Sequence, residues 1–580
     1  MLDFLPANKY DLSTKGWNQL DIIIITGDAY IDHPGFGTAL IGRYLESHGY
    51  KVGILPQPDW NNLNNFKALG KPNLYFAVTA GNMDSMVNKY TARKKIRTYD
   101  AYSPNGHINK RPDRATIVYS QKIKRIFPDI PIIIGGIEAS LRRIPHYDYW
   151  SDKLRNSILF DSRADILVYG MAEKSILTIT KLIESGKNVE EIKDVPGTVV
   201  SVKEKKLPQN STVLPEFKKE FTPKNFFEMT KRFYNNYLHR VLYQKFAHRY
   251  LKHNPPSAPL TEKEIDKIYE LPFSYKPHPQ YKNKPIKAYE QIKNSITSHR
   301  GCFGGCNFCA IALHQGKTIQ SRSQKSIQNT IQTIINKDSF NGTITDIGGP
   351  TANMYGMSCK KGISKTCSRD SCLMPEICKN LDYSHQPLLE MLKNATEIQK
   401  VKHLFVASGI RHDLALKSRK YIENLVKYHV SGLLKLAPEH KSSKILQLMN
   451  KPAFSIYQNF FKKFHNISEK MVKNQTIVPY IIVGHPGATL HDTLELAVFL
   501  KKRGIKLKQV QEFTPTPMTK STMMYYTGRD WYDSKIHIPK GREKRLQKAI
   551  VQWFKSENKK LIIEALKKID RMDLISFFLD

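Results

Sequence analysis

The sequence uses cysteine sparingly. Only seven of its 580 residues are cysteine, and all of them lie between Cys302 and Cys378. A disulfide-stabilised protein would distribute bridges through its domains, so this confinement excludes such a framework. Thiols gathered in one region indicate metal binding in a reducing compartment instead.

The sequence also lacks long apolar runs. Residues 1–6 contain no basic region followed by an apolar run, so we expect no secretory signal. The longest apolar runs, such as residues 22–25, are far too short to cross a membrane. We therefore expect a cytoplasmic protein with no membrane partner, and the length of the chain predicts two or three domains.

Acidic residues are scarce relative to basic ones. The chain has 52 Asp and Glu against 90 Lys and Arg, which gives a formal net charge of +38. A charge of this size favours a polyanionic partner such as nucleic acid. The lysines are spread along the whole chain, however, as a general compositional bias would also produce. Both interpretations stay open.

What the sequence does contain is one dense motif, GCFGGCNFC at residues 301–309. Cys302, Cys306 and Cys309 stand at spacings of four and three residues, which is typical of a loop that wraps an iron–sulfur cluster. Three ligands leave one iron of a cubane open to bind a small molecule. The glycines let the backbone turn tightly around the sulfurs. The plainer alternative is two structural thiols with a third beside them.

With Phe308 directly before the third cysteine, this motif resembles the radical S-adenosylmethionine superfamily. Four further motifs resemble the YgiQ family of that superfamily: GGPT at 348–351, LKLAPEH at 434–440, GHPG at 484–487 and FTPTP at 513–517. The resemblance covers nearly the whole chain. It implies a [4Fe–4S] cluster that binds S-adenosylmethionine, takes an electron from a flavodoxin or ferredoxin, and yields a 5′-deoxyadenosyl radical. It implies no substrate.

Residues 1–203 alternate between β-branched strands and helices, which predicts a doubly wound parallel sheet. The order resembles the cobalamin-binding domain of some radical enzymes, including a strand that ends in Gly135 and Gly136. The Asp-x-His-x-x-Gly ligand motif of those domains is missing, because His33 directly follows Asp32. We therefore interpret His33 as a turn residue and expect this fold without its cofactor.

The rest of the chain divides into three predicted regions. Residues 204–287 are rich in Lys, Pro and aromatics and read as a linker with an amphipathic helix over 226–252, whose mixed face could instead bind single-stranded nucleic acid. Residues 288–536 return to strand–helix alternation, and six such units suit the partial (β/α)6 barrel of the radical superfamily, with its chemistry at the carboxyl ends of the strands. Residues 537–580 predict a short helical C-terminus.

Candidate site residues beyond the cluster ligands follow the predicted barrel strands. Arg suits a carboxylate through its bidentate fork, and Glu and His can move protons. The cofactor-binding candidates are Phe308, Gly348, Gly349, Ser408, Arg411 and Lys435, and the catalytic candidates are Glu439 and His440. The two glycines are assigned by resemblance, and for the polar side chains the alternative is ordinary polarity at the rim of the barrel.

A second set of thiols lies in a predicted insertion at residues 355–380. Its members are Cys359, Cys367, Cys372 and Cys378. Four thiols so close together suit a closed zinc site or an auxiliary iron–sulfur cluster. Their spacing matches no standard short motif, so the identity of the metal stays open.

The leading functional hypothesis is a radical S-adenosylmethionine enzyme that abstracts hydrogen from an unknown substrate, with modification of RNA or protein the first outcome to test. One alternative is a non-catalytic iron–sulfur protein that binds nucleic acid. Another is a cobalamin-dependent radical methyltransferase, which the displaced His33 disfavours.

Overall fold

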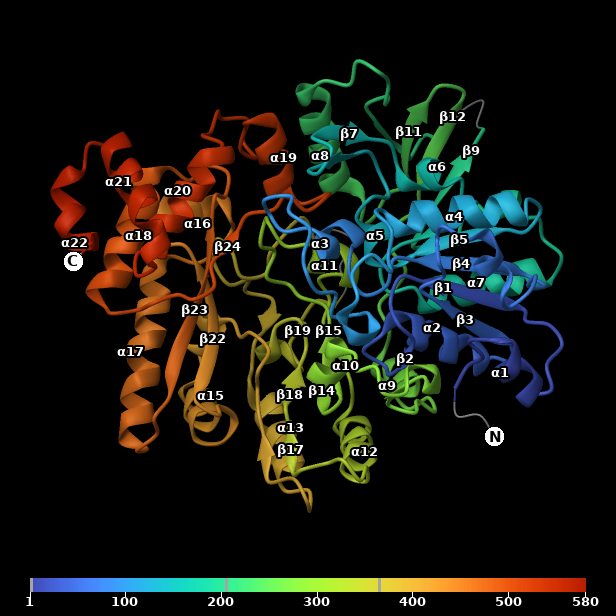
Figure 1. Ribbon diagram of the computed structural model, residues 1–580, viewed down its shortest axis with the longest axis horizontal. Helices are drawn as coiled ribbons and strands as arrows, with labels where there is room; N and C mark the ends of the chain where they lie inside the picture. The colour runs from blue at the N-terminus through green and yellow to red at the C-terminus, as the bar shows by residue number, and fades with distance from the viewer. Residues whose placement is uncertain (1–3, 204–206, 363–366, 580) are drawn as a thin grey trace.

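The computed structural model describes residues 4–203, 207–362 and 367–579. Figure 1 shows two halves side by side, with a broad sheet built from the N-terminal half and a set of strands and helices built from the C-terminal half. Residues 204–206, at a predicted domain boundary, and 363–366, in the predicted insertion, lie outside the described residues.

Five parallel strands form the centre of the N-terminal half. Each is built from buried β-branched or aromatic residues and follows the order β3 (Val52–Pro56), β1 (Ile22–Thr26), β4 (Tyr75–Thr79), β5 (Ile132–Gly135) and β8 (Ile166–Val168). Helix α4 (Ala115–Ile126) packs on one face, and helices α2 (Gly37–Glu46) and α7 (Glu173–Glu184) pack on the other. The predicted doubly wound parallel sheet is therefore present.

This sheet continues past residue 203, where the sequence predicted a helical linker. Strands β9 (Thr198–Val202), β12 (Arg249–His253), β11 (Leu242–Phe246) and β10 (Thr212–Leu214) extend the sheet to nine strands. The predicted helix over 226–252 was wrong beyond residue 236, because Leu242, Tyr243 and Leu251 are buried in a hairpin. These β-favouring residues pair with the edge that β9 would otherwise expose.

The helix that does form in this region, α8 (Pro223–Asn236), is amphipathic, as the sequence predicted. A capping box at Thr222 starts the helix, and Phe226 and Phe233 are buried on its inner side. Tyr234 donates a hydrogen bond of 2.9 Å to the carbonyl of Met518, just before α19 (Lys520–Thr527). The aromatic side of α8 therefore packs on the C-terminal half.

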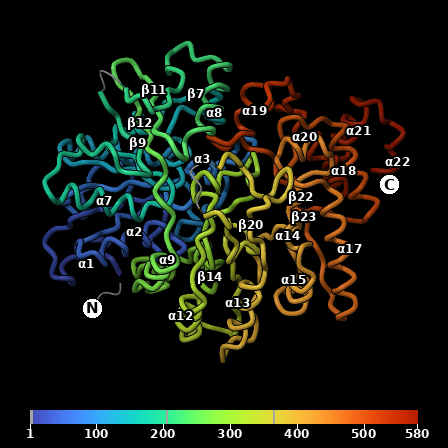
Figure 2. The backbone as a smooth tube through the Cα atoms, turned by 180° about the vertical axis from the view of Figure 1, so that it is seen from behind, coloured from blue at the N-terminus to red at the C-terminus, as the bar shows by residue number. Residues whose placement is uncertain are grey.

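Parallel pairing also dominates the C-terminal half. β14 (Ser295–Thr297) pairs with β18 (Asp346–Gly348), β17 (Thr343–Ile344) with β21 (His403–Leu404), and β23 (Thr476–Val483) with both β22 (Leu433–Glu439) and β24 (Gln511–Glu512). The helices between these strands include α12 (Gln324–Ile335), α13 (Gln386–Thr396), α15 (Arg419–Asn424), α17 (Phe454–Lys470) and α18 (Leu490–Lys502). Figure 2 shows this half from behind.

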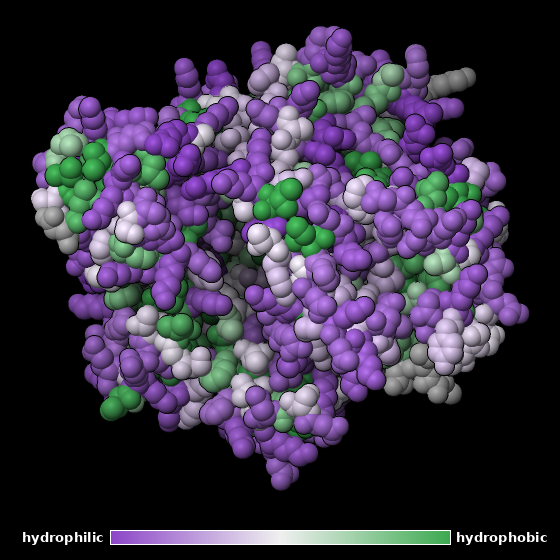
Figure 3. All heavy atoms as spheres, viewed as in Figure 1, coloured by the Kyte–Doolittle hydropathy of each residue, from purple (hydrophilic) through white to green (hydrophobic). Residues whose placement is uncertain are grey.

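The two faces of β22 have different environments. Leu434 and Leu436 pack against Phe460 and Phe464 of α17. Lys435 lies between them in sequence, points to the opposite face and is exposed. The surface of the molecule in Figure 3 is hollowed near the centre of the view.

The C-terminus is helical, as predicted. Helices α20 (Gly541–Val551), α21 (Lys559–Lys568) and α22 (Ile575–Leu579) share one core cluster with α18. Across the described ranges, no helix is both long enough and apolar enough to traverse a membrane.

The remaining elements are short. They are α1 (Lys9–Thr14), β2 (Ile31–Asp32), α3 (Ser85–Lys89), α5 (Gly136–Ser140), β6 (His146–Asp148), β7 (Lys153–Arg155), α6 (Ile158–Ser162), α9 (Glu262–Tyr269), β13 (Lys276–Pro277), α10 (Lys287–Ile292), β15 (His299–Arg300), α11 (Ile311–Gln315), β16 (Gln320–Ser321), β19 (Ser358–Cys359), β20 (Leu381–Asp382), α14 (His412–Ala415) and α16 (Ser443–Leu448).

A buried ion pair joins the two halves. Glu173 at the start of α7 lies 2.5 Å from Arg300 at the end of β15, and both side chains are almost fully buried. Arg300 also donates to the hydroxyl of Tyr269 at 3.2 Å. Because Arg300 directly precedes the three-cysteine motif, this contact fixes where that motif begins.

Glu173→Gln should destabilise the protein strongly, because it leaves the buried Arg300 guanidinium without a counter-charge. Removing one partner of a buried pair costs about 3–5 kcal/mol. Urea unfolding followed by circular dichroism measures the change. The control is Glu397→Gln, which removes an exposed partner of Lys393 and should cost under about 1 kcal/mol. Equal unfolding midpoints for the two variants would contradict the role of Glu173.

Candidate functional site

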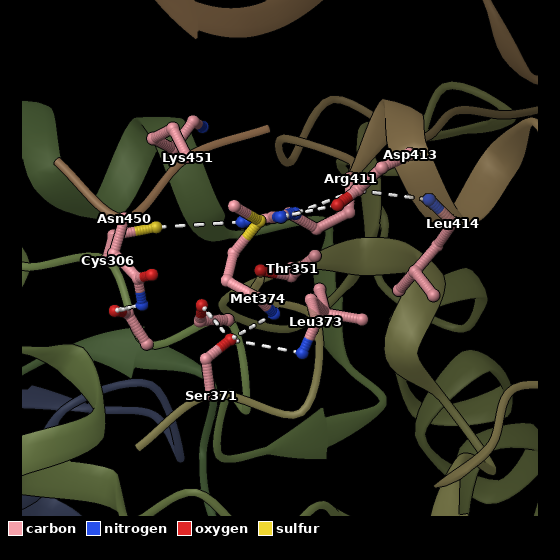
Figure 4. Close-up of polar contacts among 12 residues, drawn as sticks. Cys306, Thr351, Ser371, Leu373, Met374, Arg411, Asp413, Leu414, Asn450 and Lys451 are labelled. Carbon is pink, nitrogen blue, oxygen red and sulfur yellow. Dashed lines mark hydrogen bonds and ion pairs between the residues drawn. The ribbon is translucent and has the colours of Figure 1, made fainter. Parts of the chain in front are cut away.

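The three-cysteine motif forms a loop held by contacts from distant segments. Asn450 donates a hydrogen bond of 2.7 Å to the carbonyl of Gly305, and Ser371 donates one of 2.8 Å to the carbonyl of Gly304 (Figure 4). The backbone N–H of Asn307 donates to the carbonyl of Met449 at 3.0 Å. The segment after α16 and the predicted insertion therefore hold the loop by hydrogen bonds from two sides.

Glycine is required in this loop for space. A Cβ on Gly301 would lie 2.1 Å from the carbonyl oxygen of Thr318, and Gly301 has φ +88. At Gly304 a Cβ would stand 3.4 Å from the sulfur of Cys302 and 3.9 Å from the sulfur of Cys306. The two thiols therefore lie on the same side of Gly304, as a loop wrapped around a cluster requires.

Charges around the loop also suit a cluster. Burial raises the pKa of Cys309 to about 12 and raises that of Cys306, where Lys451 and Arg411 oppose the shift. Thiolates in such a place need additional positive charge, which iron supplies on coordination. In the described part of the chain, no three His, Cys, Asp or Glu side chains are arranged to hold one metal ion. A cubane places a different iron at each thiolate. The absence of such an arrangement therefore applies to sites for a single metal ion and not to a [4Fe–4S] cluster.

Arg411 stands over the second cysteine. Its Nη1 lies 3.6 Å from the sulfur of Cys306, while Nε and Nη2 donate to the carboxylate of Asp413 at 2.9 and 2.5 Å (Figure 4). Asn353 holds the backbone of Arg411 through hydrogen bonds of 2.8 and 3.0 Å. The guanidinium therefore faces the cluster position with its orientation already determined.

Glu439 ends strand β22 in a strained conformation. It has φ +67 and is buried, and its Oε1 lies 3.5 Å from Nζ of Lys451. Burial raises the pKa of Glu439, against the opposing charges of Lys451 and Arg411. Non-glycine residues held in this left-handed region cost of order 1–3 kcal/mol and concentrate at functional sites.

Two buried histidines lie beyond Glu439. His440 accepts a hydrogen bond from the backbone of Ser442 at Nδ1, and no described residue bonds to its Nε2. Burial lowers the pKa of His440 to about 4, so the ring is neutral at physiological pH. His485, from the GHPG motif, shares a hydrogen bond of 2.7 Å with Ser521, and its ring packs edge-on at 6.4 Å from that of Phe308.

The other predicted residues differ in how free they are to bind a ligand. Gly348 ends β18, and a Cβ on Gly349 would lie 2.6 Å from the carbonyl of His299, so this glycine is needed for packing. Ser408 donates its hydroxyl to Asp346, which also accepts from the Ser408 backbone at 3.0 Å. Lys435 is exposed on the face of β22 opposite Leu434 and Leu436.

The second set of thiols lies against the first loop. The backbone N–H of Cys372 donates to the carbonyl of Phe303 at 3.1 Å, and that of Cys378 donates to the carbonyl of Cys372 at 2.8 Å. Lys317 places its Nζ 3.8 Å from the sulfur of Cys367. Burial raises the pKa of the Cys372 thiol, an effect that Lys317 opposes and that Cys378, Cys367 and Cys359 reinforce. The four thiols therefore share one electrostatic environment.

Sequence reasoning missed the residues that support the loop. Lys451, Asn450 and Asn353 sit in or beside turns, and nothing in their spacing marks them. Asn353 follows the GGPT motif closely, and this position is the one feature of the sequence that could have identified it as a site residue. The others are brought to the cysteines by the packing of α16 alone.

Comparison with known proteins agrees with this site. The family model described as Radical SAM N-terminal matches residues 4–295, and a domain of unknown function, DUF3362, matches residues 508–578. A UPF0313 protein of Geobacter sulfurreducens is 45% identical, covering 98% of this chain and 95% of its own length. One of Methanocaldococcus jannaschii is 47% identical with the same coverage.

Among solved structures, the chain shares its fold with the radical S-adenosylmethionine methyltransferase TsrM of Kitasatospora setae, whose structure contains cobalamin and a [4Fe–4S] cluster. The TM-score is 0.50 at 12% identity, covering 87% of this chain and 77% of that one. The family match and the relatives together show that this chain belongs to the UPF0313 proteins and is a radical S-adenosylmethionine enzyme, with a [4Fe–4S] cluster and S-adenosylmethionine as its cofactors.

Proposed function

We propose that Cys302, Cys306 and Cys309 hold the [4Fe–4S] cluster and that the enzyme abstracts hydrogen from a substrate bound inside the C-terminal half. The observation that carries this proposal is the convergence of Cys302 and Cys306 on the space beside Gly304, with Arg411 at the same point. When bound, the reduced cluster supplies the electron that splits S-adenosylmethionine into methionine and a 5′-deoxyadenosyl radical.

Finer assignments follow from the same proposal. The parallel strands β14 to β24 make up a partial (β/α)6 barrel, and the chain is of the YgiQ type. A flavodoxin or ferredoxin supplies the electron, and the protein works in the reducing cytoplasm, where its seven free thiols persist.

The residues of this chain bind and orient the co-substrate. Lys451 and Arg411 provide the positive charge that suits a carboxylate, and Glu439 accepts hydrogen bonds from an ammonium or a ribose hydroxyl. The backbone at Gly348 and Gly349 approaches the ligand closely. His440, the residue after Glu439, keeps a buried Nε2 that has no partner among the described residues. Phe308 and His485 provide the aromatic wall against which the adenine packs.

Replacing Cys302, Cys306 or Cys309 with Ala should abolish the reduced-cluster EPR signal that changes when S-adenosylmethionine is added. Formation of 5′-deoxyadenosine by the dithionite-reduced protein should vanish with it, because the open iron is lost with the cluster. The matched control is Cys378→Ala, which removes a thiol of the second set and should keep the responsive signal. A triple Ala variant that still responds to S-adenosylmethionine would refute the assignment.

We propose a second metal at Cys359, Cys367, Cys372 and Cys378, and we favour an iron–sulfur cluster over zinc, because no three of the described side chains are arranged to hold a single ion. Support comes from the shared environment of the four thiols and from Lys317, which favours their charged form. The surrounding loop has few apolar residues, and a metal would add the order that burial does not, since binding free energy becomes local folding free energy.

Cys367→Ser with Cys372→Ser should remove metal in excess of one cubane and make residues 355–380 more sensitive to protease. Binding of S-adenosylmethionine should persist, because the first three cysteines are intact. Metal analysis by mass spectrometry and limited proteolysis measure the two effects. If the unaltered protein holds only the four irons of one cubane and the variant loop resists protease equally, the second site does not exist.

We propose that the N-terminal sheet binds no cobalamin, and we therefore do not favour the cobalamin-dependent methyltransferase alternative. His33 accepts a hydrogen bond from Gly35 at 2.9 Å, and its ring lies edge-on at 5.0 Å from that of Tyr275. Beyond the carboxyl ends of β1 and β4, buried ion pairs join Asp28 to Arg111 and Asp84 to Arg142. These side chains occupy the edge of the sheet where a ligand of this fold would bind.

Purification with hydroxocobalamin, followed by gel filtration, tests this directly. We expect no cobalamin absorbance in the protein peak, because no axial histidine is presented and the sheet edge is filled. Stoichiometric co-elution would overturn the conclusion and restore the methyltransferase hypothesis.

A further inference from the structure

A cleft of about 490 Å³ lies between the N-terminal domain and the C-terminal helices. One wall is the segment 91–97 after α3, and the other combines β24, α20 and the residues before α21. Figure 1 shows the blue segment after α3 beside the red C-terminal segment. Two carboxylates, Glu512 and Glu557, face six cations in this basic cleft, namely Arg93, Lys95, Arg97, Arg545, Lys548 and Lys555.

Most of this positive charge is uncompensated. Glu512 is already shared between Arg93 at 2.8 Å and Lys548 at 3.0 Å. The described residues provide no ion pair for the other four cations, which come from both walls: Lys95, Arg97, Arg545 and Lys555. Like charges held in one cleft repel one another, and a polyanion binding there relieves that repulsion.

The basic cleft adjoins the cluster site. Glu512 is followed directly by Phe513, whose ring lies 5.1 Å from that of His485. His485 in turn packs on Phe308, the residue before Cys309. The rings of Phe513, His485 and Phe308 therefore connect the wall of the basic cleft with the cluster loop.

Two large apolar side chains are exposed next to the cations of the N-terminal wall in sequence, although neither lines the cleft itself. Ile96 is 54% exposed and Tyr99 is 44% exposed, although both are large and apolar. They stand within the run Arg93 to Tyr99, beside Lys95 and Arg97. Cations with interleaved exposed aromatic and aliphatic side chains are typical of surfaces that bind a nucleic-acid strand, because phosphates and bases are contacted together. An acidic protein segment would use the cations alone.

We propose that the basic cleft binds the phosphate backbone of an RNA strand and directs one nucleotide toward the cluster site. The proposal rests on the function proposed above, because it makes RNA the substrate from which hydrogen is abstracted. The cations on the two walls bind successive phosphates, and the exposed Ile96 and Tyr99 contact bases outside the cleft.

Fluorescence anisotropy of a labelled, unstructured RNA oligonucleotide on the anaerobically reconstituted protein tests the proposal. The slope of log K against log salt should be about −0.7 for each phosphate neutralised. Lys95→Gln with Lys555→Gln removes two contacts, so the slope should become shallower by about 1.4 and binding about 25-fold weaker at 0.1 M salt. The matched control is Lys470→Gln with Lys473→Gln, two exposed lysines at the end of α17, which should change neither quantity.

Four results would overturn the RNA assignment: no salt-dependent binding by the unaltered protein, equal weakening in both double variants, equal competition by polyglutamate, or equal competition by a nucleoside triphosphate at the same phosphate concentration. The third would identify an acidic protein partner and the fourth a nucleotide site. Formation of 5′-deoxyadenosine without RNA is measured in parallel. Its absence from the unaltered protein would refute the proposed function, whereas normal formation with failed RNA binding would refute this inference alone.

Discussion

Placing three half-buried thiols in one loop is the constraint on which the rest of the site depends. Away from water a thiol resists ionisation, and burial raises the pKa of Cys309 to about 12. The chain places Arg411 and Lys451 near Cys306 to offset this effect, and iron would complete the compensation. The orientation of Arg411 and of the loop backbone is as important as the charge near the thiols. Asp413 and Asn353 fix Arg411, while Asn450 and Ser371 hold the loop backbone.

The two halves of the chain depend on each other through this loop. Glu173 belongs to the N-terminal sheet domain, yet it neutralises Arg300, the residue directly before the cysteine motif. The aromatic side of α8 likewise packs against the segment that leads into α19. Such buried contacts make relative movement of the halves costly, so the basic cleft between them is a fixed feature of the surface and not a transient gap.

Much of the site could be predicted from local sequence. The cysteine spacing, the glycines and the motifs after each strand all lie within short windows, and buried β-branched runs marked the parallel strands. The hairpin at residues 242–253 was missed because its mixture of Tyr, Lys and Arg suits an amphipathic helix as well as an edge strand, and only the open edge of β9 decides between them. Lys451 was missed because tertiary packing alone brings it near Cys306, and Asn353 because its bonds to the distant Arg411 backbone cannot be read from its place after the GGPT motif.

The central claim is that one [4Fe–4S] cluster sits on Cys302, Cys306 and Cys309 with its fourth iron open. Crystals grown anaerobically with S-adenosylmethionine, measured above and below the iron absorption edge, test it most directly. We expect a compact anomalous peak bonded to these three sulfurs, with the amino and carboxylate groups of S-adenosylmethionine on the remaining iron. An iron peak elsewhere, or a fourth protein ligand closing the cluster, would contradict it.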